Sequence, residues 1–123
     1  MQLLLVMIGG ALGSGARHLT GRAMLALAGA GFPYGTLCVN LVGGLLMGAL
    51  AGLLARSGGN EDVRLFVGVG ILGGFTTFSA FSLDVVTMLE RGAAAAAFGY
   101  VLLSVIGAIA ALVAGLALVR SVA

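Results

Sequence analysis

The chain has 123 residues, enough for one domain, and hydrophobic residues make up 61% of it while charged residues make up only 8%. Soluble domains carry roughly 25% charged residues. Six basic and four acidic side chains cannot coat a water-soluble domain of this length, so most of the surface must face lipid. The composition excludes a soluble enzyme and a disordered segment, and the net charge of +2 is too small to neutralise the backbone of a nucleic acid.

Four apolar segments, separated by short polar stretches, form a single domain over residues 1–123. The predicted spans lie at about 2–27, 34–55, 65–89 and 93–119. Each has the roughly 20 residues that a helix needs to cross the bilayer core. The most polar stretch, residues 56–64, is expected to be a loop. We therefore expect an all-α membrane protein with four transmembrane helices and both termini on one side.

Basic residues are divided evenly between the two sides of these spans. The side of the termini has Arg56, Arg64 and Arg120, and the opposite side has Arg17, Arg22 and Arg91. The positive-inside rule needs an asymmetry in such counts. The tie predicts insertion in both orientations, so that two inverted copies can pair, unless a small protein tied by chance. The first helix continues past Arg17, whose long stem can reach toward the interface.

The third span contains an unusual run of small and hydroxyl residues. Residues 68–82 have four glycines followed by four serines and threonines. Paired glycines and then adjacent threonines favour a break in this helix near residues 73–79. A break within the bilayer frees carbonyls that must meet another chain, a water or a cation. In the alternative interpretation, the glycines fit a tight helix crossing and the hydroxyls bond to carbonyls one turn earlier.

Asn40 is the only amide placed well inside an apolar span. It can donate hydrogen bonds to a solute, or it can join two helices. Carboxylates are expected only near the ends of the spans, with Glu61 and Asp62 in a loop and Asp84 and Glu90 in the last turns of the third span. Because proton and cation transport usually needs an intramembrane acid, the polar groups of the spans suit a small anion better.

Three phenylalanines, Phe75, Phe78 and Phe81, recur at a spacing of three and are expected to align on one helix face. The edge of an aromatic ring carries positive partial charge, so an anion can lie against it. Apolar packing is the commoner use of such rings, and the spacing alone does not decide between the two.

In the fourth span, Tyr100 and Ser104 present hydroxyls one turn apart, and Ala108 continues the same face without a donor. Cys38 is the single cysteine, so one chain can build neither a disulfide nor a cysteine metal site. Its simplest role is that of a small packing residue.

Over nearly its whole length, the chain resembles the Fluc or CrcB family of fluoride channels. The resemblance is carried by G-G-A-L-G-S-G-A-R at 9–17, P-Y-G-T-L-C-V-N at 33–40 and G-G-F-T-T-F-S-A-F-S at 73–82. It implies an antiparallel, dual-topology homodimer in the cell inner membrane. Two pores of this dimer would export fluoride passively down its electrochemical gradient and so relieve fluoride toxicity.

The resemblance also implies a role for each matching residue. The fluoride pathway would be lined by Asn40 as amide donor, by the rings of Phe78 and Phe81, and by the hydroxyls of Tyr100 and Ser104. Arg17 matches a vestibule arginine that attracts anions. Gly73 and Thr76 would bind a structural Na⁺ through main-chain carbonyls, two from each chain. Ala108 continues the face of Tyr100 and Ser104 without a hydroxyl, so the row of donors along the fourth span is one donor short. Phe75 has no implied role.

Two other functions remain open at this point. A small four-span antiporter for drugs or cations would need a membrane-embedded carboxylate in its first helix, and residues 2–27 contain none. A non-transporting assembly subunit would associate stably with another membrane protein and would conduct nothing when purified alone.

Overall fold

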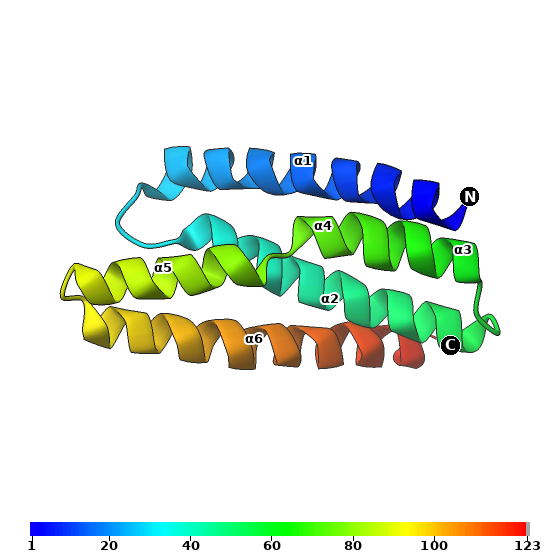
Figure 1. Ribbon diagram of the computed structural model, residues 1–123. Helices are drawn as coiled ribbons and strands as arrows, with labels where there is room; N and C mark the ends of the chain where they lie inside the picture. The colour runs from blue at the N-terminus through cyan, green and yellow to red at the C-terminus, as the bar shows by residue number, and fades with distance from the viewer. Residues whose placement is uncertain (123) are drawn as a thin grey trace.

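A computed structural model describes residues 1–122, which form a bundle of four long helical spans with both termini at one end (Figure 1). The elements are α1 (Gln2–Ala28), α2 (Tyr34–Arg56), α3 (Glu61–Val63), the π-helix η1 (Arg64–Leu72), α4 (Gly73–Phe75), α5 (Phe78–Glu90) and α6 (Ala94–Ser121). Elements α3 to α5 together make the third span. The prediction of an all-α protein with four helices apolar enough to cross a membrane is confirmed.

The third span begins earlier than predicted, because part of the expected loop at 56–64 is helical. The side chain of Asn60 accepts a hydrogen bond of 3.1 Å from the Val63 N–H, and Glu61 and Asp62 occupy the first turn. A side-chain cap and acidic residues both stabilise a helix start. The most polar stretch of the chain therefore contains the start of a helix as well as a loop.

α2 packs mainly on α6, and glycines bring the two helices close together. A Cβ atom on Gly48 would overlap the Leu112 carbonyl, and one on Gly115 would overlap the Leu45 carbonyl. Small residues are used in this way where membrane helices approach backbone to backbone. The pair forms a tight scaffold on one side of the bundle.

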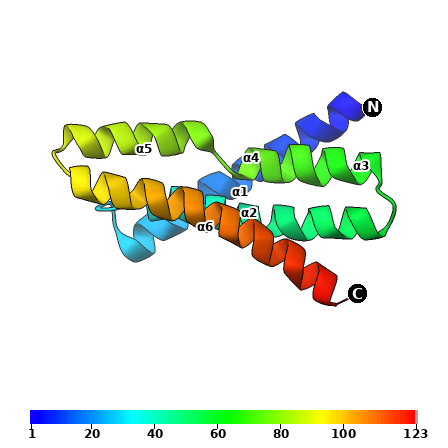
Figure 2. The ribbon, with the colours of Figure 1, turned by 90° about the horizontal axis from the view of Figure 1, so that it is seen from below.

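α1 runs obliquely across the other helices (Figure 2) and packs on η1 and α4. Here too the backbones nearly touch, because a Cβ atom on Gly70 would lie 2.9 Å from the Gly9 Cα. The second half of the third span, α5, packs on α6 instead. The two halves of the third span are therefore supported by different helices.

The third span is interrupted between α4 and α5, close to the middle of the bundle's length (Figure 1). The backbone is extended at Thr76 (φ −83°, ψ 161°) and at Thr77 (φ −154°, ψ 123°). Phe75 precedes this interruption, whereas Phe78 and Phe81 follow it. The expectation that the three rings share one helix face is therefore wrong, since a helical face does not continue through extended residues.

Candidate functional site

A groove of about 370 Å³ lies between α2, α5 and α6, beside the interruption. Its lining includes the predicted site residues Asn40, Thr76, Phe78, Phe81 and Ser104. The sequence places these residues up to 64 positions apart, and the fold brings them to one place. Most of the remaining lining is apolar, so polar solutes would meet only a few donors there.

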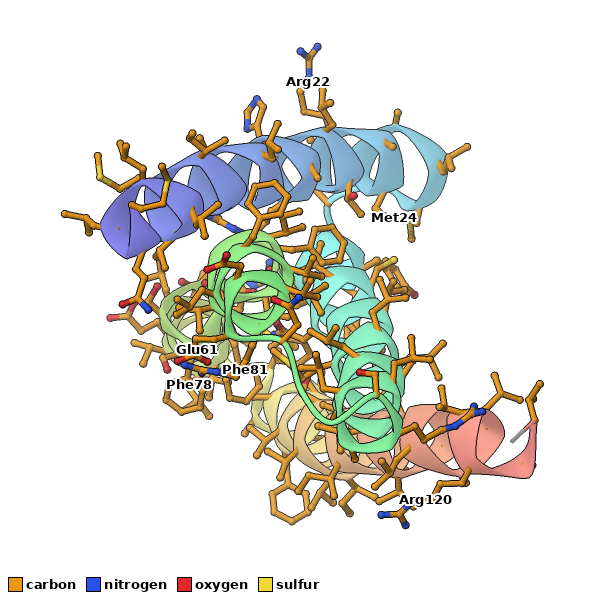
Figure 3. All side chains as sticks on the ribbon, turned by 90° about the vertical axis from the view of Figure 1, so that its right-hand side faces the viewer. Arg22, Met24, Glu61, Phe78, Phe81 and Arg120 are labelled. Carbon is orange, nitrogen blue, oxygen red and sulfur yellow. The ribbon has the colours of Figure 1, made fainter. Side chains whose placement is uncertain are left out.

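The two aromatic rings of the groove differ in exposure. Their centroids lie 5.6 Å apart at an interplanar angle of 43°. Phe81 is only 8% exposed and packs on Tyr100, whereas Phe78 is 77% exposed in the single chain. Both side chains lie on the side of α5 away from α1 (Figure 3). Phe78 therefore presents a ring that the chain itself leaves uncovered.

Asn40 bonds to the interruption through both ends of its amide. Its Nδ2 donates to the Thr77 carbonyl at 3.0 Å, and its Oδ1 accepts from the Thr77 N–H at 2.8 Å. The amide has two N–H groups, so one donor is left after these bonds are made. Both interpretations of Asn40 are compatible with this geometry, because it joins α2 to the third span and keeps a donor at the groove.

Two of the carbonyls at the interruption lose their helical N–H partners to side-chain acceptors. In a continuous helix, the N–H of Thr77 would bond to the Gly73 carbonyl and the N–H of Ala80 to the Thr76 carbonyl. Here the Thr77 N–H donates to Asn40 and the Ala80 N–H to Thr77 Oγ1 at 3.1 Å. The carbonyls of Gly73 and Thr76 are thereby available to another partner, as a main-chain cation site requires.

The neighbouring carbonyl, that of Gly74, accepts a hydrogen bond of 3.0 Å from Arg17 Nε. The expectation that the Arg17 stem reaches toward the interface is therefore wrong, because the guanidinium turns inward to the interruption. Arg17 also lines a second pocket of about 450 Å³, together with His18 and Arg22. A pocket with two guanidinium groups has a positive potential that concentrates anions.

Ser104 supplies an unpaired hydroxyl to the groove. The residue is 5% exposed, and its Oγ has no hydrogen-bond partner within residues 1–122. A buried hydroxyl without a partner costs roughly 1–3 kcal/mol. A water, an ion or a second chain would remove this cost. Ala108 lies in the same lining and has no polar group to offer.

Tyr100 lies behind the groove rather than in it. It is completely buried, and its hydroxyl donates to Asp84 Oδ2 at 2.9 Å. Asp84 lies within the last two turns of the third span, as predicted, since α5 ends at Glu90. Asp84 is three residues after Phe81 and so shares its helix face, but no local pattern in the sequence places Tyr100 against that face.

The four hydroxyls of the third span do not all bond in the same way. Thr76 Oγ1 donates to the Leu72 carbonyl at 3.0 Å and Ser82 Oγ to the Phe78 carbonyl at 2.9 Å, each one turn earlier. Thr77 instead caps α5, and it lies 3.4 Å from Ser79 Oγ. The alternative interpretation therefore holds for two of the hydroxyls and fails for Thr77.

The fold defines a multi-pass membrane protein whose groove offers an amide, a hydroxyl and ring edges to a solute. The model of the family described as CrcB-like protein, Camphor Resistance (CrcB), matches residues 4–116, and the chain belongs to this family. With its curated relatives, this family consists of ion channels and not of enzymes, and four spanning helices fit a multi-pass protein of the plasma membrane.

Two relatives carry a more specific name. A protein of Mesorhizobium japonicum, named fluoride-specific ion channel FluC, is 59% identical over 119 residues, which cover 97% of this chain and 96% of the relative. A protein of the same name from Sphingopyxis alaskensis is 61% identical over 116 residues, covering 94% of this chain and 92% of the relative.

Proposed function

We propose that the chain is a fluoride-selective channel that lets fluoride leave the cell down its electrochemical gradient. The groove that gathers Asn40, Phe78, Phe81 and Ser104 beside the interruption carries this proposal. The two relatives described above are named fluoride-specific ion channels, which supports fluoride as the permeating ion. Because the cell interior is electrically negative, an anion flows outward without coupling to another energy source.

The main barrier for fluoride is the loss of its tightly bound water. The groove offers the free N–H of Asn40, the unpaired hydroxyl of Ser104 and the ring edges of Phe78 and Phe81 as replacements. A larger halide fits a narrow pathway less well and gains less from the same donors. Selectivity then follows from size and from donor strength rather than from a fixed charge in the groove.

The conducting unit is a homodimer of two oppositely inserted chains with two equivalent pores. The even division of arginines supports this arrangement. Phe78 is 77% exposed and the backbone of Gly73 is also exposed in one chain, so the polar and aromatic groups of the site stand uncovered. A second, inverted copy would complete the wall of each groove.

A structural Na⁺ fits the carbonyls that the interruption frees. Gly73 and Thr76 of both chains would supply four carbonyl oxygens near the dimer axis. When bound, the ion would add positive charge near the anion pathways. Within residues 1–122, no cluster of three or more acidic, histidine or cysteine side chains competes for a metal. Arg17, on the adjacent Gly74 carbonyl, adds a further positive charge near the interruption.

Ion efflux from liposomes containing the purified protein tests this function. Fluoride and chloride electrodes should record fast fluoride release and chloride release no greater than from protein-free liposomes. Equal release of both anions would refute selectivity. Absence of any flux would favour an assembly subunit, and flux that requires a pH gradient and a cationic drug would favour an antiporter.

A further inference from the structure

We propose that Asn40 and Thr77 are positioning residues of the cation site. They bond to the two N–H groups that would otherwise occupy the carbonyls of Gly73 and Thr76. This inference rests on the proposed Na⁺ site and deepens it. It assigns both side chains a role that is separate from any contact with fluoride.

The Asn40 bonds fix the backbone of the interruption on one side. Asn40 Oδ1 accepts a hydrogen bond of 2.8 Å from the Thr77 N–H, and Asn40 Nδ2 donates one of 3.0 Å to the carbonyl of the same residue. The two bonds hold the peptide units on both sides of the Thr77 Cα, and so fix the backbone at the point where the helix is interrupted. They are made across 37 residues of sequence, so the packing of α2 determines the geometry. A Cβ atom on Gly43, one turn after Asn40, would overlap Thr76 Cγ2, so α2 fits closely against the interruption.

The side chain of Thr77 keeps the Thr76 carbonyl free by accepting the N–H that would otherwise bond to it. Its backbone is extended and its Oγ1 accepts the Ala80 N–H at 3.1 Å, as an N-cap residue does. Valine has nearly the same shape and also favours an extended backbone. A valine at this position would remove the acceptor alone, and the Ala80 N–H would then compete for the Thr76 carbonyl.

Competition with an N–H group weakens a carbonyl as a cation ligand, because the carbonyl dipole turns toward the hydrogen. Partners that orient the ligands of a metal typically change its affinity by about 10-fold to 100-fold when they are mutated. We expect a shift of this size when either acceptor oxygen is removed. Variants that retain the oxygen should keep the carbonyls free.

Two matched pairs of variants test the inference, Thr77→Val against Thr77→Ser and Asn40→Leu against Asn40→Asp. The full-length protein is purified in detergent, and its melting temperature is measured against Na⁺ concentration at constant ionic strength, with N-methylglucamine as the replacing cation. The half-saturating Na⁺ concentration should rise by about 10-fold to 100-fold in Thr77→Val and Asn40→Leu. It should stay near the wild-type value in Thr77→Ser and be no higher in Asn40→Asp, which adds a negative charge.

The possible results distinguish a failure of the positioning role from a failure of the proposed Na⁺ site. Unchanged Na⁺ dependence in Thr77→Val overturns the inference while the cation site stands. Absence of Na⁺ dependence in the wild type overturns the cation site and the inference together, although fluoride flux can still be measured. If Asn40→Leu does not fold, the Thr77 pair alone decides, because its members differ by one hydroxyl.

Discussion

The α2–α6 pair and the third span both use glycine for close packing, but only the third span is interrupted. In the pair, both helices are uninterrupted, and Gly48 and Gly115 let the backbones meet. In the third span, Gly73 and Gly74 precede an interruption whose hydrogen bonds are made by side chains of α1 and α2. A rigid scaffold therefore lies beside a segment whose main-chain carbonyls are free to bind another partner. Substitutions in the first should affect assembly, and those in the second should affect transport.

Gly48→Leu should have the largest effect, because the new side chain would collide with the Leu112 carbonyl on α6. Overpacking by even a few methylenes costs about 1–3 kcal/mol, and a collision with backbone cannot relax by a rotamer change. We expect little or no monodisperse protein by size-exclusion chromatography. Gly99→Ala is the matched control, since a Cβ atom there meets nothing within 4 Å. Normal yield of Gly48→Leu would contradict the tight scaffold.

Phe78→Ile should retain assembly and lose transport. The ring is 77% exposed in one chain, so its removal should cost the fold of that chain little. Loss of the ring edge should lower fluoride flux in liposomes by about tenfold or more, equal to roughly 1.4 kcal/mol of barrier. Phe81→Ile should do the same at a higher cost in stability, because Phe81 packs on Tyr100. Full flux in both variants, with the dimer intact, would exclude a role for the ring edges.

Arg17→Gln should lower flux several-fold at low ionic strength, because it removes a positive charge from the second pocket. The deficit should shrink when an impermeant salt shortens the Debye length, which is about 10 Å at 0.1 M. Arg17→Lys keeps the charge and should conduct better than Arg17→Gln. Equal flux of the two variants at every salt concentration would mean that Arg17 acts only by binding the Gly74 carbonyl.

Ala108→Ser should have the smallest effect, a rise in fluoride flux of about twofold. The new hydroxyl would add a donor to the groove, but a net hydrogen bond is worth only about 1 kcal/mol and tighter binding also slows release. Ala110→Ser, on the same helix but outside the groove lining, should leave the flux unchanged. A decrease in Ala108→Ser alone would show that the groove has no room for another atom.

The four spans could be predicted from the sequence, and the contacts of the interruption in the third span could not. Bilayer thickness sets the length of an apolar helix, so composition alone defines four spans. Capping is a short-range signal, and Asn60 followed by Glu61 and Asp62 could have shown that a helix starts within the expected loop.

The contacts of the interruption depend on distant parts of the chain. Arg17 meets Gly74 across 57 residues and Asn40 meets Thr77 across 37, so no local pattern reports these bonds. The spacing of the phenylalanines misled in the same way, because a helical period holds only while the helix continues. The hydroxyl of Tyr100 was expected among the donors of the pathway, and only the packing of α5 on α6 reveals its bond to Asp84.

The path of fluoride along the groove between α2, α5 and α6 can be tested with a thiol placed in it. In a Cys38→Ala background, Ala108→Cys places a thiol in the groove and Ala110→Cys places one outside it. Ag⁺ is small and binds the soft sulfur of a thiolate tightly. If fluoride follows this groove, Ag⁺ should abolish fluoride efflux from liposomes containing Ala108→Cys and leave efflux through Ala110→Cys intact. Block of both variants alike, or of Ala110→Cys alone, would contradict it.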